Sequence, residues 1–153
     1  MIMKQSFDLR KGVDFIGVTC VFLCHDGKGN FLMHKRSKNC RDEIGRWDTG
    51  SGSMEFGETP EQAVRREIKE EYCVTAKNLR FCGVRNALRT HNGTKTHWVA
   101  LLYVVQVDPK KVKIGEPDKM DEISWFRTDK LPRPIHSAFR DQLKIMRQSG
   151  MKL

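Results

Sequence analysis

Three glutamates form the cluster in this sequence that is best suited to chemistry. Glu67, Glu70 and Glu71 are spaced i, i+3 and i+4, so a helix would place them on one side. Carboxylates this close repel one another, by roughly 0.2–0.5 kcal/mol for each pair in water. A hard divalent cation that takes oxygen ligands, Mg²⁺ or alternatively Mn²⁺, would turn this repulsion into attraction. The cluster therefore indicates either a metal site or a solvated acidic face of a helix.

The residues before the cluster predict where its helix begins. Thr59 is a natural N-cap, Pro60 suits the first helical position, and Gln62 can complete a capping box. An apolar stripe at i, i+4 and i+8 is formed by Val64, Ile68 and Tyr72. We therefore expect a helix from about Thr59, with one buried side and one strongly acidic side.

The full spacing around the glutamates resembles the signature sequence of the Nudix hydrolases. Gly52, Glu58 and the segments 66–68 and 70–71 stand at the family's intervals. One position departs from the pattern, because Cys73 stands where the family has glycine. This position ends the helix, where glycine would ease the chain into a left-handed turn, and the change removes no metal ligand.

The resemblance implies a loop and a helix that hold divalent cations against a diphosphate. Glu67 and Glu71, four residues apart, are the first expected ligands of Mg²⁺ or Mn²⁺. Glu70 is expected to be a third ligand, or the base that takes a proton from the attacking water. The resemblance also suggests the backbone carbonyl of Gly52 as a ligand, and Glu58 is expected to bind metal or to brace the loop.

Two further roles in catalysis follow from the resemblance. Arg66 is expected to orient a glutamate through a charge-assisted hydrogen bond rather than to touch the substrate. In parts of the family the catalytic base comes from a later loop. The acids available there are Glu116, Asp118, Asp121 and Glu122.

The activity that the resemblance implies is Mg²⁺-dependent hydrolysis of a pyrophosphate bond in a nucleoside diphosphate linked to another group. Segments 56–59 and 116–119, with Trp125 and Phe126, look like enzymes that convert nucleoside triphosphates, including altered ones, to monophosphate and pyrophosphate. Alternatives are hydrolysis of ADP-ribose, a nucleotide sugar, a dinucleoside polyphosphate or a non-nucleotide diphosphate. A non-catalytic module that binds RNA or a nucleotide is a further alternative, although an acidic cluster would repel such polyanions.

Contacts to the rest of a nucleotide are harder to assign. Stacking on a base needs a ring near the mouth of the cleft, and the candidates are Phe139, His136 and Trp47. Simple packing is the alternative for each of the three. The candidates for phosphate contacts are Lys35, Arg36 and Arg89.

Length and composition suit a single domain over residues 1–153 of an ordinary cytoplasmic protein. The 153 residues are 31% charged and 39% hydrophobic, with no apolar run of about 18–20 residues and no secretory signal near the start. The net charge of +9 predicts attraction to polyanions such as a small nucleotide substrate, and nucleic acid is the less favoured partner. A membrane partner is not expected, and a homodimer is compatible with the sequence.

The cysteines do not indicate a disulfide framework. There are five, an odd number, and they include no close CxxC pair. Cys20, Cys24 and His25 offer a zinc site as one interpretation. Buried reduced thiols are the favoured one.

The order of apolar runs predicts the fold class. Strands are expected over residues 14–25, 31–36, 78–88, 96–107 and 121–126. The run 96–107 is too apolar for an edge strand, so we expect it in the interior of the sheet. A second helix is predicted over 137–148. This order, which the resemblance also implies, suits an α/β fold in which a mixed β-sheet lies between helices, a Nudix-like α/β/α sandwich.

Overall fold

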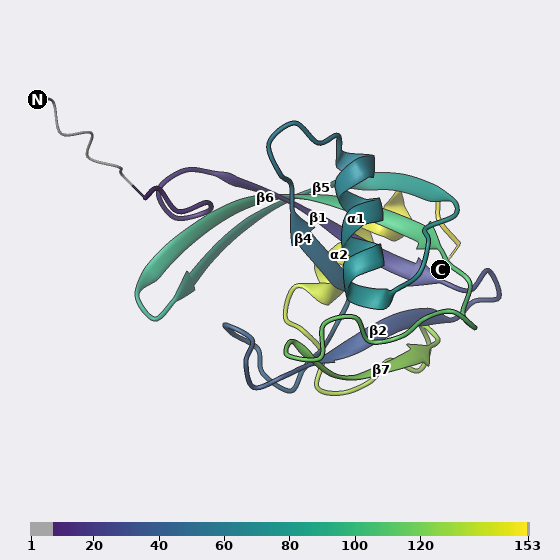
Figure 1. Ribbon diagram of the computed structural model, residues 1–153. Helices are drawn as coiled ribbons and strands as arrows, with labels where there is room; N and C mark the ends of the chain where they lie inside the picture. The colour runs from purple at the N-terminus through teal and green to yellow at the C-terminus, as the bar shows by residue number, and fades with distance from the viewer. Residues whose placement is uncertain (1–7, 153) are drawn as a thin grey trace, which may run out of the picture.

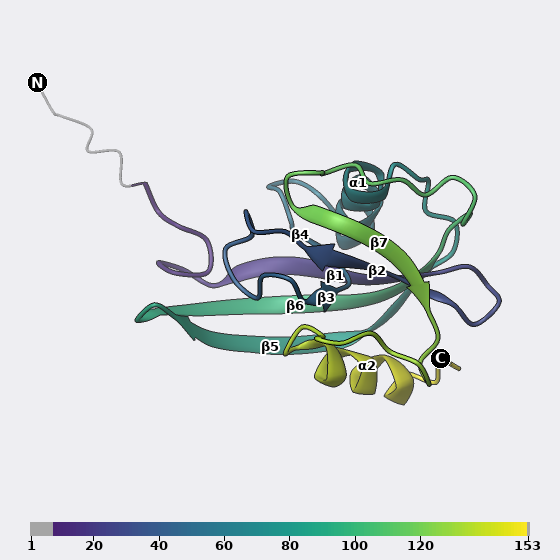
Figure 2. The ribbon, with the colours of Figure 1, turned by 90° about the horizontal axis from the view of Figure 1, so that it is seen from below.

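A mixed β-sheet with one helix on each face forms the body of the protein. The structure, a computed structural model, describes residues 8–152. Helix α1 (Pro60–Tyr72) covers one face of the sheet and helix α2 (Phe139–Gln148) covers the other (Figures 1 and 2). This arrangement confirms the predicted α/β/α sandwich. The strands are β1 (Gly17–His25), β2 (Phe31–Arg36), β3 (Trp47–Asp48), β4 (Gly50–Ser53), β5 (Leu79–His91), β6 (Thr94–Gln106) and β7 (Met120–Phe126).

Strand β1 lies at the centre of the sheet. The strand order is β3-β2-β1-β6-β5, with β4 also paired to β1 and β7 also paired to β2. β1 runs parallel to β6, and the other pairings between these strands are antiparallel. The apolar run predicted to be interior is β6, which lies between β1 and β5, so this prediction is confirmed.

The hairpin of β5 and β6 is longer than the sequence predicts. β5 ends at His91 rather than at residue 88, and the hairpin projects from the body of the sheet (Figure 1). Its turn is centred on Asn92 and Gly93, with φ angles of 47° and 77°. Two successive positive φ angles match the twist of antiparallel strands, which allows the pairing to continue to the turn.

Strands β3 and β4 go beyond the prediction. The segment that contains them is rich in small polar residues, which have low intrinsic β-propensity. It is extended because its neighbours supply partners: Gly52 pairs with Cys20 of β1, and Asp48 pairs with His34 of β2. This pairing places the glycine-rich segment directly beside α1.

Helix α1 begins as its local sequence predicts. The hydroxyl of Thr59 accepts from the backbone N–H of Gln62 at 3.2 Å, and the Gln62 side chain accepts from the Thr59 N–H at 2.9 Å. This is a complete capping box. The predicted apolar stripe of Val64, Ile68 and Tyr72 is fully buried.

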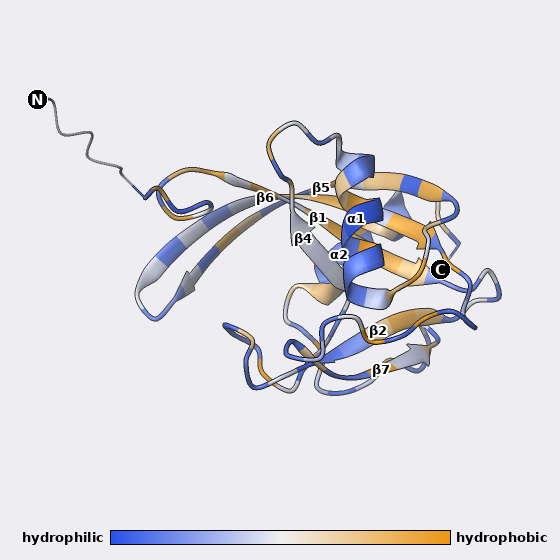
Figure 3. Cartoon of the chain, viewed as in Figure 1, coloured by the Kyte–Doolittle hydropathy of each residue, from blue (hydrophilic) through white to orange (hydrophobic). Residues whose placement is uncertain are grey.

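Two apolar cores lie on opposite faces of the sheet. One is under α1 and includes Cys20 and Cys24; the other is under α2. Figure 3 shows the apolar residues concentrated in the central strands. Burial raises the pKa of the Cys20 thiol to about 11, so the favoured interpretation of buried reduced thiols is confirmed for these two residues. The zinc alternative gains no support, because no three His, Cys, Asp or Glu side chains within residues 8–152 are arranged to hold a metal ion.

Neither helix in residues 8–152 has the length and apolar character needed to cross a membrane. Residues 1–7, on which the expectation about a secretory signal partly rests, lie outside the described residues.

We predict that Cys73→Gly stabilises the protein. Cys73 ends α1 in the left-handed conformation, with φ 56°, and its side chain is exposed. Glycine removes the cost of that conformation but loses more entropy on folding, so the expected net gain is about 0.5–1 kcal/mol. In a domain of this size that raises the Tm by about 2 °C in thermal unfolding. Cys73→Ala is the matched control and should not raise the Tm, because alanine keeps the backbone cost; an equal rise would contradict this account.

Candidate active site

The glutamates of α1 differ sharply in their surroundings. Glu71 is only 6% exposed, and its Oε2 atom has no hydrogen-bond partner within residues 8–152. The side chain of Glu67 is 13% exposed, whereas that of Glu70 is 50% exposed. Glu67 and Glu71 therefore turn inward, and the alternative of a solvated acidic face does not hold for them.

The absence of a side chain at Gly52 makes room for Glu67. A Cβ atom at Gly52 would lie 1.9 Å from Cδ of Glu67, which no real contact allows. The carbonyl of Gly52 accepts a hydrogen bond from the Thr19 hydroxyl at 3.0 Å, which fixes β4 against β1. Glycine at this position thus lets a strand and a carboxylate occupy adjacent space.

Arg66 links three carboxylates, those of Glu58, Glu67 and Glu70. It donates two hydrogen bonds to Glu58, from Nε at 2.6 Å and from Nη2 at 3.0 Å, and one to Glu67 at 2.7 Å. Its Nη1 lies 3.5 Å from Oε2 of Glu70. The hydrogen bonds from Arg66 lower the pKa of Glu58 to about 2. Glu58 also accepts from the backbone N–H of Glu55, so in this structure it braces the loop before α1.

The segment before β7 brings a further acid to the site. The N–H of Lys113 donates to the carbonyl of Tyr72 at 3.0 Å, and the N–H of Gly115 donates to the carbonyl of Glu71 at 2.8 Å. These bonds satisfy carbonyls that the end of α1 would leave unpaired. A Cβ at Gly115 would lie 1.9 Å from the carbonyl oxygen of Glu70, so this close approach also needs glycine.

Glu116 follows directly and shares a cavity with Glu71. Of the four acids considered as an alternative base, it is the one that lines this cavity. Asp118, Asp121 and Glu122 are exposed and do not line it.

The carboxylates at this end of the protein raise one another's pKa. Burial raises the pKa of Glu71 well above its usual range, and the charges of Glu67 and Glu116 raise it further. Burial also raises the pKa of Glu67, although the hydrogen bond from Arg66 opposes the rise. The site therefore holds more negative charge than the surrounding protein compensates.

A polar cavity of about 260 Å³ opens over Glu71 and Glu116. Glu71, Glu116 and Ser51 line it together with basic residues of the facing loop and strand, which are Arg36, Arg41 and Lys119. His34 also lines it, and its Nδ1 lies 2.8 Å from the hydroxyl of Tyr72. Burial lowers the pKa of His34 to about 4, so this histidine is neutral at pH 7.

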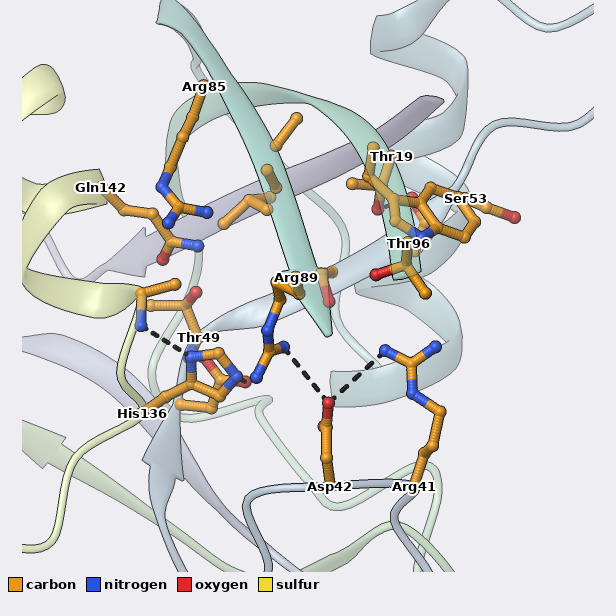
Figure 4. Close-up of a pocket in the computed structure, with 18 of the residues that line it drawn as sticks. Thr19, Arg41, Asp42, Thr49, Ser53, Arg85, Arg89, Thr96, His136 and Gln142 are labelled. Carbon is orange, nitrogen blue, oxygen red and sulfur yellow. Dashed lines mark hydrogen bonds and ion pairs between the residues drawn. The ribbon is translucent and has the colours of Figure 1, made fainter. Parts of the chain in front are cut away.

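A second cavity of about 290 Å³ adjoins the first. Ser51, Arg36 and Arg41 line both, so the two form a continuous cleft. The second cavity extends over the sheet to the start of α2 (Figure 4). Across its lower side in this view, Arg89 lies 3.2 Å and Arg41 3.5 Å from the same carboxylate oxygen of Asp42. An acidic end and a longer basic arm thus share one opening.

Comparison with known families agrees with this architecture. Residues 15–148 match the profile of the NUDIX domain. The chain belongs to the Nudix family. The resemblance noted in the signature segment therefore extends over most of the sequence.

Solved Nudix structures share its fold. The MutT NUDIX hydrolase from Burkholderia pseudomallei is 30% identical, with a TM-score of 0.75 over 85% of this chain and 97% of that chain. The NUDIX domain of Shewanella oneidensis NrtR, complexed with ADP ribose, has a TM-score of 0.69 at 16% identity and covers 94% of this chain and 91% of that one. At that identity the second likeness concerns the fold alone.

Curated relatives match a smaller part of the chain. The NAD-capped RNA hydrolases NudC of Salmonella paratyphi B and Escherichia coli are 32% identical over 87 residues, which is 54% of this chain. The match spans only 29% of the length of those relatives.

Two of the three rings expected to contact a base do not reach the cleft of this Nudix domain. Phe139 is buried in the core under α2, and Trp47 packs edge-on against Phe126 with ring centroids 4.9 Å apart. Both residues lie in apolar positions of a helix and a strand, which face the core. His136 does line the cleft, and its Nδ1 accepts from the N–H of Ala138 at 3.1 Å.

Two of the three basic residues expected to contact phosphates lie in the cleft. Arg36 and Arg89 line the cleft, whereas Lys35 does not. Arg41 and Lys119 at the acidic end were missed, because nothing in their local sequence distinguishes them from the other basic residues. Thr49, Arg85 and Gln142 in the longer arm were also missed. Gln142 left a signal: it lies three residues after Phe139 and four before Met146, so it is a polar residue on the apolar face of α2.

The acidic end of this Nudix domain suits a hard divalent cation. No three acidic, histidine or cysteine side chains converge there as arranged within residues 8–152. The donor set is nevertheless appropriate, because Glu71 has an unpartnered buried oxygen and Glu67 occupies the space left by Gly52. Of the five expected ligands, Gly52 adjoins Glu67 and the charge of Glu67 acts on Glu71, while Glu58 and Glu70 turn toward Arg66, which also bonds Glu67.

We predict that Glu71→Gln stabilises the metal-free protein as the pH rises. Because the folded-state pKa of Glu71 is raised above its ordinary value of 4.5, its contribution to stability is full below that value. The contribution is lost as the pH rises through the folded-state pKa. Glutamine has no such loss, so the variant should exceed wild type in Tm by at least about 2–4 °C at pH 8 and by little at pH 5.

Thermal unfolding at both pH values without divalent cations checks this. Adding Mg²⁺ at pH 8 should raise the Tm of wild type more than that of the variant, since binding to the folded state stabilises it. Glu122→Gln, at an exposed position of β7, is the matched control and should show no pH-dependent gain. A lower Tm for Glu71→Gln at pH 8 would show that the ionised carboxylate is already compensated in the protein.

Proposed function

We propose that this Nudix domain is a Mg²⁺-dependent hydrolase that converts a nucleoside triphosphate, including altered ones, to the monophosphate and pyrophosphate. The observation that carries the proposal is the buried, unpartnered carboxylate oxygen of Glu71 beside Glu67 and Glu116, at the acidic end of a basic cleft. Uncompensated acids suit a cation, and the basic residues around them suit phosphates. A module that merely binds a polyanion gains nothing from this acidic end.

The reaction is the attack of water on a phosphorus of the anhydride. The bond from that phosphorus to the bridging oxygen breaks, pyrophosphate leaves, and the proton of the water goes to a carboxylate. A divalent cation held by Glu67 and Glu71, either Mg²⁺ or Mn²⁺, would supply charge neutralisation and a lowered pKa for the attacking water. Arg41 and Lys119 line the same cavity and are placed to hold phosphate oxygens.

We infer that Glu116 is the catalytic base rather than Glu70. Glu116 lines the cavity with Glu71, where Nζ of Lys119 lies 3.3 Å from Oε1 of Glu116, whereas Glu70 is half exposed, lines neither cavity and is close to Arg66. Arg66 acts as a positioning residue, since it holds Glu67 and Glu58 rather than facing the cleft.

The longer arm of the cleft would hold the nucleoside. Its volume of about 290 Å³ is at the lower end of the range for small-molecule sites, roughly 300–1,000 Å³. The NudC relatives are NAD-capped RNA hydrolases, which favours a second candidate in which a dinucleotide or capped end is cleaved. Both candidates share the cleaved pyrophosphate and differ in the leaving group. A cytoplasmic location, expected from the sequence, is part of this proposal.

The test is a screen of substrates with the products identified by mass. Nucleoside triphosphates, ADP-ribose, NAD, dinucleoside polyphosphates and nucleotide sugars are each incubated with Mg²⁺ and the protein. We expect the highest kcat/KM for a nucleoside triphosphate, with monophosphate and pyrophosphate as products. A highest kcat/KM for NAD or ADP-ribose would select the second candidate instead.

We predict that Glu71→Gln and Glu116→Gln each lower kcat at least about a hundredfold, the range typical of losing a general base or an essential carboxylate. Glu116→Gln should also remove the acidic limb of the pH–rate profile, which a merely structural role would leave in place. Glu70→Gln should have the smaller effect, and Glu122→Gln none. If wild type and variants are equally inactive on the whole panel while RNA binding persists, the protein is a binding module.

A further inference from the structure

Two buried polar atoms in the long arm of the cleft lack partners. Within residues 8–152 the buried side-chain oxygens and nitrogens without a hydrogen-bond partner are Thr49 Oγ1, Gln142 Oε1 and Glu71 Oε2. Thr49 and Gln142 line the long arm, and Glu71 lines the adjoining acidic cavity. Such atoms are rare in native proteins because leaving them unpaired is unfavourable. Their gathering in one continuous cleft indicates that a ligand completes their hydrogen bonds.

Both side chains are held rigidly by the fold. Gln142 is 6% exposed and lies on α2 between Phe139 and Met146, which are buried in the core. Thr49 is 2% exposed and lies between β3 and β4, and its backbone N–H donates to the Asp48 carboxylate at 2.8 Å. Figure 4 shows Gln142 beside Arg85, across the cavity from Thr19, Ser53 and Thr96. These groups are therefore preorganised for a ligand rather than free to find other partners.

The position of Gln142 indicates which part of a ligand it meets. α2 covers the face of the sheet opposite to α1 (Figure 2). Gln142, on α2, lines the long arm, whereas Glu71 lines the adjoining cavity, so Gln142 lies at the end of the cleft away from Glu71. If the phosphates of a nucleotide lie at the acidic end of the cleft, its base reaches the end that Gln142 lines. The Gln142 oxygen can only accept a hydrogen bond, so it requires an N–H or O–H from the ligand.

The polar side chains at this end of the long arm suit the hydrogen-bonding edge of a nucleobase. A side-chain amide can pair with a base that presents an N–H group beside a ring nitrogen or a carbonyl, donating one bond and accepting another. The Thr49 hydroxyl can donate or accept, and the Arg85 guanidinium can donate to a carbonyl or ring nitrogen. Within residues 8–152 the side chain of Arg85 has one ion pair, with Asp141 at 3.7 Å, and it lines the cleft, so its other donors can reach a ligand.

We propose that Gln142 and Thr49 hydrogen-bond the base of the bound nucleotide: the cleft takes a base edge that carries an N–H donor beside an acceptor, as every standard base does, and it discriminates against a base from which that N–H has been removed. This inference rests on the proposed function for the presence of a nucleotide and names the residues that hold its base. Until a ligand is bound, the unpaired polar atoms of both residues lower the stability of the folded protein. When a base is bound, the same atoms pair with it and contribute to its recognition.

Stability of the free protein is the first test. Gln142→Met and Thr49→Val remove the unpaired atoms with little change in volume. Each should raise the Tm of the ligand-free protein by about 2–4 °C, the shift expected in a domain of this size when one unfavourable buried group is removed. Gln148→Met, at an exposed position of the same helix, and Thr90→Val, exposed on β5, are the matched controls and should leave the Tm unchanged. A fall in Tm for both cleft variants would overturn the inference.

Discrimination between bases is the second test. The preferred nucleoside triphosphate is compared with its analogue lacking the N–H, which for ATP is purine riboside triphosphate. Wild type should show about a tenfold lower kcat/KM for the analogue, the usual effect of one lost hydrogen bond. Gln142→Met should lower kcat/KM for the parent nucleotide about tenfold and abolish the discrimination, and Thr49→Val should reduce it. Both exposed-site controls should discriminate as wild type does.

The outcomes separate this inference from the proposed function. Hydrolysis of nucleotides without discrimination in wild type, or with discrimination unchanged in both cleft variants, would overturn the inference and leave the function standing. A binding experiment tests the inference if the protein hydrolyses no substrate. It measures by calorimetry the binding of nucleoside monophosphates in the absence of metal. If no substrate is hydrolysed but binding depends on the N–H of the base and on Gln142, the inference stands and the proposed function fails. Equal binding of the parent nucleotide and of its analogue without the N–H would in that case overturn both.

Discussion

The burial of negative charge between β4 and α1 is the constraint on which the rest of the structure depends. A carboxylate with few partners is expensive to bury, and Glu71 lies near the C-terminal end of a helix, where the macrodipole also disfavours an anion. Two glycines make the arrangement sterically feasible, Gly52 beside Glu67 and Gly115 beside the carbonyl of Glu70. Arg66 compensates the charges of Glu58 and Glu67. Glu71, whose buried Oε2 has no hydrogen-bond partner within residues 8–152, faces the cleft.

The surrounding elements hold these groups in place through backbone contacts. The capping box fixes where α1 begins, the pairing of β4 with β1 fixes Gly52, and the bonds from residues 113 and 115 dock the last loop on the end of α1. None of these contacts uses the side chain of Glu67, Glu71 or Glu116. The reacting groups can therefore be strained and mutually repulsive while the scaffold remains stable, which is how active sites commonly hold unfavourable charge.

How much the sequence predicts depends on whether a feature is local. The start of α1 and its apolar stripe follow from neighbouring residues and were predicted, whereas the left-handed end at Cys73 was expected from the family resemblance. Strand β4 could not be, because its glycines and serines become extended only through pairing with β1. Glu116 could be named but not chosen among four acids, since contacts between distant segments decide its place. The sequence left Phe139 open between stacking on a base and core packing, because apolar periodicity marks burial without saying whether the neighbour is core or cavity; the structure places it in the core.

The short segment from Thr49 to Ser53 connects the two ends of the cleft. Gly52 touches the carboxylate of Glu67, Ser51 lines both cavities, and the unpaired hydroxyl of Thr49 lies in the long arm. Because β4 is paired to the central strand, the distance between the acidic end and the far wall is set by the sheet rather than by mobile loops. A ligand must then present its phosphates and its base at a fixed separation. Substitutions of Gln142 can change how the base is held without disturbing the acids, because Gln142 projects from α2 whereas Glu67 and Glu71 project from α1.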